Sequence, residues 1–163
     1  MLSFILSLYF IIIPNRVSSD TRNDTEAPCR HYQQLGCYEG EFDEGGADCS
    51  GYQACLKASM DLPDDVLCTG ASSCAKARIK ADGKIDCSGY KACFNAVYLI
   101  SKKSSVQCHG QEACGEELRI SAGGGSVFCD GFHSCKDGSI QSDETIFCDG
   151  TKACTNANMS AGM

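Results

Sequence analysis

The chain has 163 residues and repeats one seven-residue motif six times, and this repeat limits the possible folds more than any other feature. The motif reads Cys-x-Gly-x-x-(Ala or Ser)-Cys, and the first cysteines of successive copies lie 19, 19, 21, 21 and 19 residues apart. The glycines of the motif are Gly51, Gly70, Gly89, Gly110, Gly131 and Gly150. A period of this length indicates a repeat protein in which each copy is one structural unit.

Hydrophobic residues at fixed distances from the motif predict short strands. An aliphatic residue stands two positions before the first cysteine in five copies, and Ala47 takes that place in the first copy. After the second cysteine, a stretch of the type Cys74-x-x-Ala77-x-Ile79 alternates as far as Ala81. Helical repeats need about 33 residues or more, whereas alternation suits a strand. We therefore expect an all-β fold, a small parallel β-solenoid (β-helix) of about six coils over residues 49–163, whose handedness the sequence leaves open.

A coil of this length encloses little space, because 19 fully extended residues span at most about 65 Å. Cysteine, alanine, serine and one or two aliphatic residues per coil would fill it, which leaves no room for a substrate. The stacked motif glycines are expected to form one corner, to supply positive φ there and to tolerate alanine badly.

The cysteines are expected to stabilise a chain that has too few large hydrophobic residues for an ordinary core. From Asp20 onward, Val, Ile, Leu and Phe make up about 15% of the residues, whereas the chain holds 14 cysteines. Pairing within each motif is favoured over the alternative that joins Cys55 to Cys68 and so on between coils. The favoured pairs are Cys49–Cys55, Cys68–Cys74, Cys87–Cys93, Cys108–Cys114, Cys129–Cys135 and Cys148–Cys154, with Cys29–Cys37 upstream. Metal clusters are disfavoured, because five residues separate the motif cysteines and zinc ligands are usually closer.

The first residues predict secretion. Residues 1–13 are almost wholly apolar but too short to span a bilayer, and small residues at Val17 and Ser19 fit cleavage of a signal peptide over residues 1–19. Residues 20–48 are expected to form a polar tail and an acidic N-terminal cap. Asn23 and Asn158 begin glycosylation sequons. We therefore expect a secreted, extracellular glycoprotein without a membrane span.

The run C-x-x-x-x-x-C-x-x-A resembles the repeat of the disulfide-rich beetle antifreeze β-solenoids. It occurs at 49–58, 68–77, 87–96 and 148–157. The resemblance implies bridges inside each coil and a flat face that binds ice through Thr-x-Thr rows. This chain has a longer period and lacks such a row, because Ser50, Thr69, Ser88, His109, Asp130 and Asp149 follow the first cysteines.

No motif of a known catalytic type is present, and the three histidines (His31, His109 and His133) are too scattered to indicate a base. We therefore expect no enzyme, no catalytic residues, and no cofactor or metal beyond weak surface calcium. A formal charge of −7 argues against nucleic acid as a partner. Aromatic residues share the position after the motif glycine in three copies, and they are expected either to shield the disulfides or to stack on sugar rings: Tyr52, Tyr90 and Phe132.

The sequence thus predicts a non-enzymatic structural or surface-binding protein of an extracellular matrix. The matrix could be mineralised, since carboxylates such as Asp130 and Asp149 attract calcium. The alternative is an ice-binding or carbohydrate-binding solenoid. Expected partners are an extracellular surface, matrix or mineral, and a second copy stacked end to end.

Overall fold

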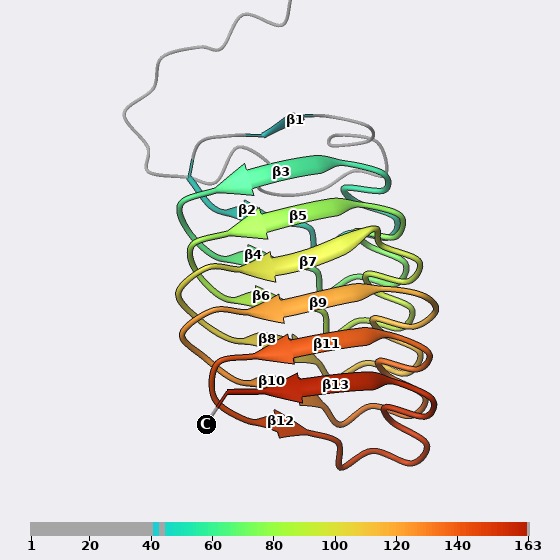
Figure 1. Ribbon diagram of the computed structural model, residues 1–163. Coiled ribbons are helices and arrows are strands. Elements are labelled where there is room, and N and C mark those ends of the chain that lie inside the picture. The colour runs from blue at the N-terminus through green and yellow to red at the C-terminus, as the bar shows by residue number, and fades with distance from the viewer. Residues whose placement is uncertain (1–40, 43–44, 163) are drawn as a thin grey trace, which may run out of the picture.

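The computed structural model describes residues 41–42 and 45–162, and these form a stack of coils with two parallel sheets as walls (Figure 1). The predicted all-β solenoid of about six coils is confirmed. The described part of the chain contains no helix able to cross a membrane. Several predicted features lie outside the described residues: the signal peptide 1–19, the tail and most of the cap, the Cys29–Cys37 pair, Asn23 and His31.

Each coil contributes one strand to each sheet. The long sheet has the order β1-β3-β5-β7-β9-β11-β13. Its strands are β1 (Glu41–Phe42), β3 (Ser59–Leu62), β5 (Arg78–Ala81), β7 (Tyr98–Ser101), β9 (Arg119–Ala122), β11 (Ser139–Ser142) and β13 (Asn158–Ala161). The short sheet has β2 (Ala47–Asp48), β4 (Val66–Leu67), β6 (Ile85–Asp86), β8 (Val106–Cys108), β10 (Val127–Cys129) and β12 (Ile146–Phe147). Neighbouring strands of both sheets pair in parallel.

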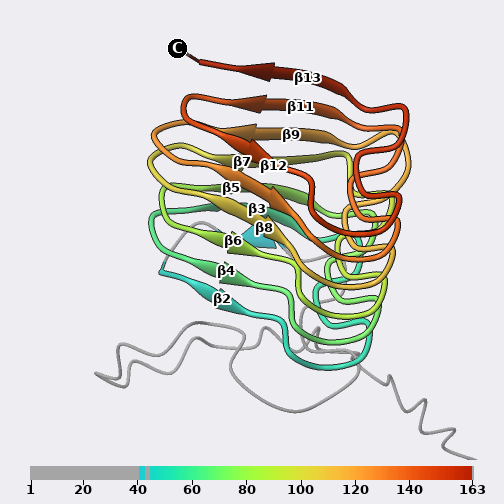
Figure 2. The ribbon, with the colours of Figure 1, turned by 90° about the horizontal axis from the view of Figure 1, so that it is seen from below.

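The coil is right-handed. The strands of the long sheet and those of the short sheet run in opposite directions across the molecule, and the chain advances by one strand position per coil (Figures 1 and 2). This is the hand found in nearly all connections between parallel strands, because the strands themselves have a right-handed twist. The structure therefore settles the handedness that the sequence left open.

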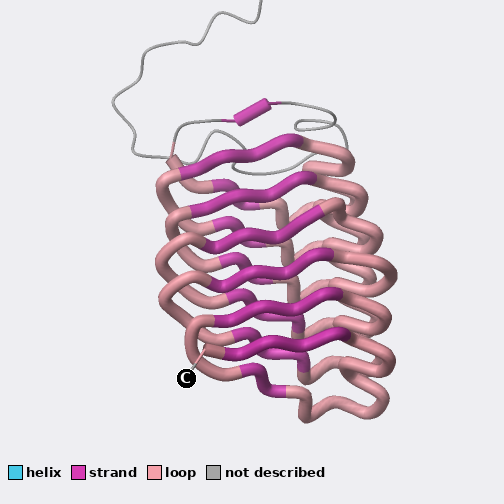
Figure 3. The backbone as a smooth tube through the Cα atoms, viewed as in Figure 1, coloured by secondary structure: helices cyan, strands magenta, loops and turns pink. Residues whose placement is uncertain are grey.

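The third wall of the solenoid, which we call the motif wall, is made of the six motifs and the two residues after each, and it contains almost no strand (Figure 3). Every second residue is left-handed, as at Lys91, Cys93 and Asn95, with φ of 52°, 52° and 54°. The N–H of Lys91 donates to the carbonyl of Gln111 in the next coil (2.9 Å), and that of Cys93 donates to Ser73 in the previous coil (2.9 Å). The N–H groups of the left-handed residues therefore form hydrogen bonds between neighbouring coils.

The intervening residues of the motif wall close tight turns within the coil. The N–H of Ala92 donates to the carbonyl of Gly89, three residues back (3.1 Å). The predicted alternating stretch after the second cysteine is consequently shorter than expected. In the second coil the strand starts only at Arg78, because Cys74 and Lys76 have φ of 51° and 58°.

The motif glycines stack as expected, but the reason we gave for them is wrong. Gly45 and Gly124 are the glycines with positive φ among the described residues, and neither belongs to a motif. Close approach requires the motif glycines of the second to sixth coils: a Cβ at Gly110, for example, would lie 2.1 Å from the carbonyl oxygen of Gly89. The backbone of one coil therefore occupies the space where the next coil would need a side chain.

The core lies between the three walls and consists of columns of identical positions. The inward residues of the described strands include Met60, Ile79, Leu99, Ile120 and Ile140 from the long sheet and Ala47, Val66, Ile85, Val106 and Val127 from the short sheet, none more than 2% exposed. Buried serines replace alanine in the motif at two places, where Ser73 Oγ donates to the Gly70 carbonyl (2.7 Å) and Ser134 Oγ to that of Gly131 (2.9 Å). The choice of alanine or serine at this position thus follows from a buried site that can satisfy one hydroxyl.

The two coils of 21 residues place their extra residues where the coil turns. Arg78, Tyr98 and Arg119 pair in register, although Tyr98 lies five residues after Cys93 and Arg78 only four after Cys74. The second extra residue of each long coil lies in the corner between the two sheets, after β7 in one coil and after β9 in the other. Strands, bridges and motifs therefore stay aligned through all six coils.

Candidate functional site

The six motif disulfides are each closed within one coil, which confirms the favoured pairing and excludes pairing between coils. In every bridge the two Cα atoms are 5.9 to 6.0 Å apart. Sulfur atoms of neighbouring bridges approach closely, and two groups of three lie within 4.8 Å: Cys49, Cys55 and Cys74, and Cys68, Cys74 and Cys93. Because these sulfurs are joined in buried disulfides, they are part of the core and offer no thiolate ligands.

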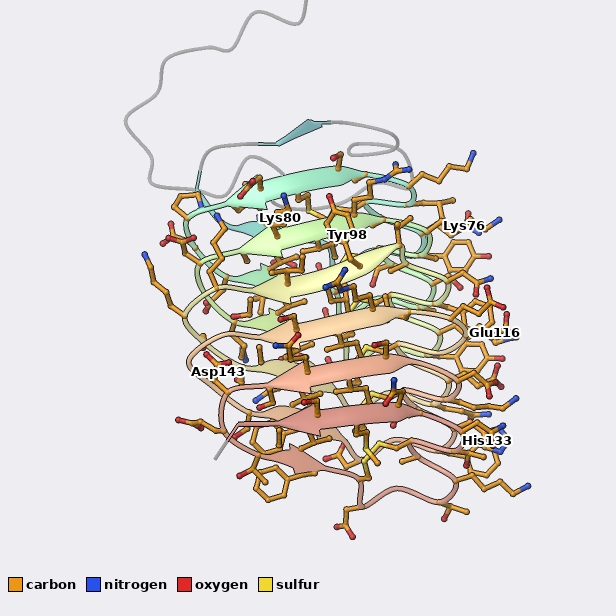
Figure 4. The ribbon with its side chains drawn as sticks, viewed as in Figure 1. Lys76, Lys80, Tyr98, Glu116, His133 and Asp143 are labelled. Carbon is orange, nitrogen blue, oxygen red and sulfur yellow. A yellow bond between two sulfur atoms is a disulfide. The ribbon has the colours of Figure 1, made fainter. Side chains whose placement is uncertain are left out.

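The outer surface is therefore where this molecule can meet a ligand, and the motif wall is its most regular part. Lys76, Glu116 and His133 point outward from this wall (Figure 4). The second motif position forms an exposed column of Ser50, Thr69, Ser88, His109, Asp130 and Asp149. The fifth position forms a parallel column of Gln53, Ser72, Lys91, Glu112, His133 and Lys152.

Between these two columns, the fourth motif position carries the aromatic residues. Tyr52, Tyr90 and Phe132 are 56%, 49% and 44% exposed, and we call them the aromatic row. They belong to the first, third and fifth coils, and the coils between them carry the smaller Ala71 and Gln111. The row is thus exposed and regularly spaced.

Contacts within the motif wall hold parts of the row in place. Lys91 Nζ lies 5.4 Å from the centre of the Tyr90 ring and 3.2 Å from Glu112 in the next coil. Glu112 and, to a smaller extent, Tyr90 raise the pKa of Lys91 above its ordinary value. The His133 ring stacks on Phe132 with 4.1 Å between ring centres.

Of the two aspartates that the sequence suggested for calcium binding, Asp130 contacts a neighbouring side chain. Asp130 Oδ1 lies 2.5 Å from Nδ1 of His109, directly along the column in the previous coil. Among the described residues, the groups of three possible metal ligands are those of the disulfide sulfurs. Asp130 and Asp149 therefore remain exposed carboxylates without an assembled ligand set.

A ladder of ion pairs crosses three coils at the corner between the two sheets. Lys102 Nζ lies 2.9 Å from Asp61 and 3.1 Å from Asp82, and Lys103 Nζ lies 2.6 Å from Asp82. Lys103 first, and then Lys102, lower the pKa of Asp82, while Asp61 and then Asp82 raise the pKa of Lys102. This ladder was not predicted from the sequence; its signal was the opposite charges of Asp82 and Lys102, which follow paired strand ends in successive coils.

The outer face of the long sheet mixes charge, hydroxyl, amide and aromatic groups. Its central strands present Arg78 and Lys80, then Tyr98, then Arg119, and Lys80 Nζ lies 5.8 Å from the Tyr98 ring centre (Figure 4). The described strands of this face carry no repeated pair of threonines. Asn158 is exposed in β13, so the second sequon lies on the surface.

An open hollow of about 630 Å³ lies where the two long coils carry their extra residue. Its lining includes Glu116, Glu117 and Asp137. Asp137 accepts a hydrogen bond from Asn156 (2.9 Å) and pairs with Lys136 (3.2 Å), and these two contacts, in that order, lower its pKa. Three carboxylates from two neighbouring coils thus lie around one hollow at the edge of the motif wall.

Comparison of the chain with models of protein families, with curated proteins and with solved structures finds no match. The class is therefore defined by the fold itself. The chain is a cysteine-rich parallel β-solenoid whose coils are each closed by a disulfide.

Proposed function

We propose that the protein is a secreted, non-enzymatic structural or surface-binding component of an extracellular matrix. The observation that carries this proposal is the column of six disulfides, each closed within its own coil. Disulfides form and persist in oxidising compartments and are rare in the cytosol. The apolar leader over residues 1–19 supports the same location.

The distribution of side chains supports a role for the outer surface. Bridges and aliphatic residues fill the interior, while hydroxyl, carboxylate and aromatic groups recur outside at the spacing of the coils. A stiff body with repeated outer groups suits contact with an extended or periodic partner, such as a matrix polymer or a mineral. The exposed carboxylates Asp130 and Asp149 give such a matrix a weak calcium-binding contribution.

Expression of the full chain in a eukaryotic secretory cell line tests the proposal. We expect the protein in the medium, starting at Asp20, with no thiol that reacts after denaturation. Isolated matrix from the source tissue should retain it. Accumulation in the cytosol with reduced cysteines would overturn the proposal, and hydrolysis of any member of a polysaccharide panel would overturn its non-enzymatic part.

Ice binding is the second candidate, because the in-coil bridges are the ones that the resemblance to beetle antifreeze solenoids implies. The outer faces argue against it, since charged residues such as Arg78, Lys80 and Arg119 interrupt the long sheet. We therefore expect no thermal hysteresis from the purified protein. A measurable hysteresis would favour the ice-binding alternative.

A further inference from the structure

We propose that the aromatic row and the polar columns beside it bind one extended β-1,4-linked polysaccharide chain, of the cellulose or chitin type. The inference rests on the proposed secretion, because such polymers lie outside cells. It assigns a ligand class to one surface of the solenoid, the motif wall.

Exposure is the first argument. The row supplies three of the six large hydrophobic side chains that are exposed among the described residues, and all three occupy the same motif position. The bridges of the coils that carry Ala71 or Gln111 at this position are as fully buried as those of the coils that carry Tyr90 or Phe132, so burial of a bridge does not require an aromatic ring there. Exposed aromatic rings that share one column can contact one ligand from the same direction.

Spacing is the second argument. The N–H groups of Ser72 and Glu112 donate to the carbonyls of Tyr90 (2.8 Å) and Phe132 (2.8 Å), so the fourth positions of successive coils are stacked by backbone hydrogen bonds. The backbone positions that carry the rings, in alternate coils, are then about 9.6 Å apart, twice the spacing of neighbouring strands. This distance is close to one disaccharide repeat of an extended β-1,4-linked chain. In such a chain every second sugar ring presents the same face, so three rings of the protein would meet alternate sugars.

The chemistry beside the row is the third argument. Hydroxyl, amide, imidazole and carboxylate groups form the columns on either side, and these can exchange hydrogen bonds with sugar hydroxyls. The contacts of Lys91 with Tyr90 and of His133 with Phe132 restrict the two rings before binding. Less conformational entropy is then lost when a ligand binds.

The primary test measures retention of the secreted, oxidised protein on microcrystalline cellulose and on chitin. We expect retention on at least one of them, and comparison of the two identifies the sugar. Starch, which is α-linked and coiled, and a β-1,3-glucan should retain little. The chain has no tryptophan, so quenching of tyrosine fluorescence by soluble cello- or chito-hexaose gives a second, solution measurement.

Variants separate spacing from mere hydrophobicity. Tyr90→Ala should weaken binding about tenfold, the size expected for one binding hot spot. The exchange Tyr90→Gln with Gln111→Tyr keeps the composition but breaks the two-coil spacing, and it should weaken binding as much. Phe147→Ala removes a similarly exposed ring (46%) from the short sheet and should leave binding unchanged.

The inference is overturned if neither polymer retains the protein, or if the exchange variant binds as well as the wild type. Thiol counts and far-ultraviolet spectra establish that each variant is folded. Secretion with all cysteines oxidised but without glycan binding would refute this inference alone, whereas cytosolic accumulation would refute the proposed function.

Discussion

At the scale of single residues, the motif glycines of the second to sixth coils are required by contact between coils and not by backbone torsion. Gly110→Ala should lower stability by about 3 kcal/mol, because the new methyl group would overlap backbone, which cannot move as a side chain can. Thermal and denaturant unfolding measure this loss.

The first motif supplies the matched control for the glycine prediction. A Cβ at Gly51 would find Ala54 as its nearest neighbour, at 3.6 Å. Gly51→Ala should therefore change stability by no more than about 0.5 kcal/mol, as for an ordinary surface substitution. Equal effects of the two substitutions would contradict the packing explanation.

The second cysteine of each motif is left-handed, a conformation that costs an ordinary residue about 1–2 kcal/mol. Replacing Cys87 and Cys93 together by alanine should cost about 2–4 kcal/mol, because a closed loop is released in the unfolded chain while the left-handed residue remains. Denaturant unfolding under non-reducing conditions measures the change.

The last bridge provides the comparison for the central one. Cys148 is exposed, and its coil has a described neighbour on one side only. Replacing Cys148 and Cys154 should loosen that coil locally and reduce global stability less. A larger loss at the last bridge than at the central one would argue against this account.

At the scale of structural elements, the ion-pair ladder between the sheets makes the stability of the fold depend on pH. The pKa of Asp82 lies below its ordinary 3.8 in the folded protein. The contribution of this carboxylate to stability is therefore fully present above pH 3.8 and is lost as the pH falls through its pKa in the folded protein. The pKa of Lys102 lies above its ordinary 10.5 in the folded protein. The contribution of this ammonium group to stability is therefore fully present below pH 10.5 and is lost as the pH rises through its pKa in the folded protein. The ladder should therefore act at full strength between these limits, and salt should weaken it.

Thermal unfolding of Asp82→Asn tests the ladder. The variant should melt a few degrees below the wild type at neutral pH and low salt, and the difference should shrink in strong acid and at high salt. Asp149→Asn, an exposed substitution in the last coil, should show little difference at any of these conditions. A constant difference across pH would show that Asp82 acts through packing instead of charge.

At the scale of the whole molecule, each coil contacts mainly its two neighbours, so coils should be removable as units. Deletion of residues 68–86 removes one 19-residue coil and brings two equivalent coils together. We expect a folded protein with one disulfide fewer and a smaller denaturant m-value, because less surface is exposed on unfolding. Deletion of residues 75–84, which removes part of a coil and misaligns the strands, is the control and should abolish folding.

The architecture was largely readable from the sequence because each repeat encodes the same local environment. The period and the inward aliphatic residues were predicted from spacing, and pairing within each motif was favoured over pairing between coils. The outer surface was only partly predictable: the sequence showed the shared motif position of Tyr52, Tyr90 and Phe132, whereas it did not show their exposure or the ladder around Asp82. Exposure and ion pairing depend on which residues of different coils lie side by side, and the two extra residues in each of the two long coils shift the sequence distance between such neighbours.

By itself, the sequence determined that the chain winds into narrow coils and favoured a disulfide within each, because the motif spacing and the side-chain alternation act within about twenty residues. The tertiary structure decided the hand of the coil, the left-handed backbone of the motif wall and the reason for its glycines. Each of these depends on contact between one coil and the next, where hydrogen bonds and excluded volume act between residues far apart in the chain.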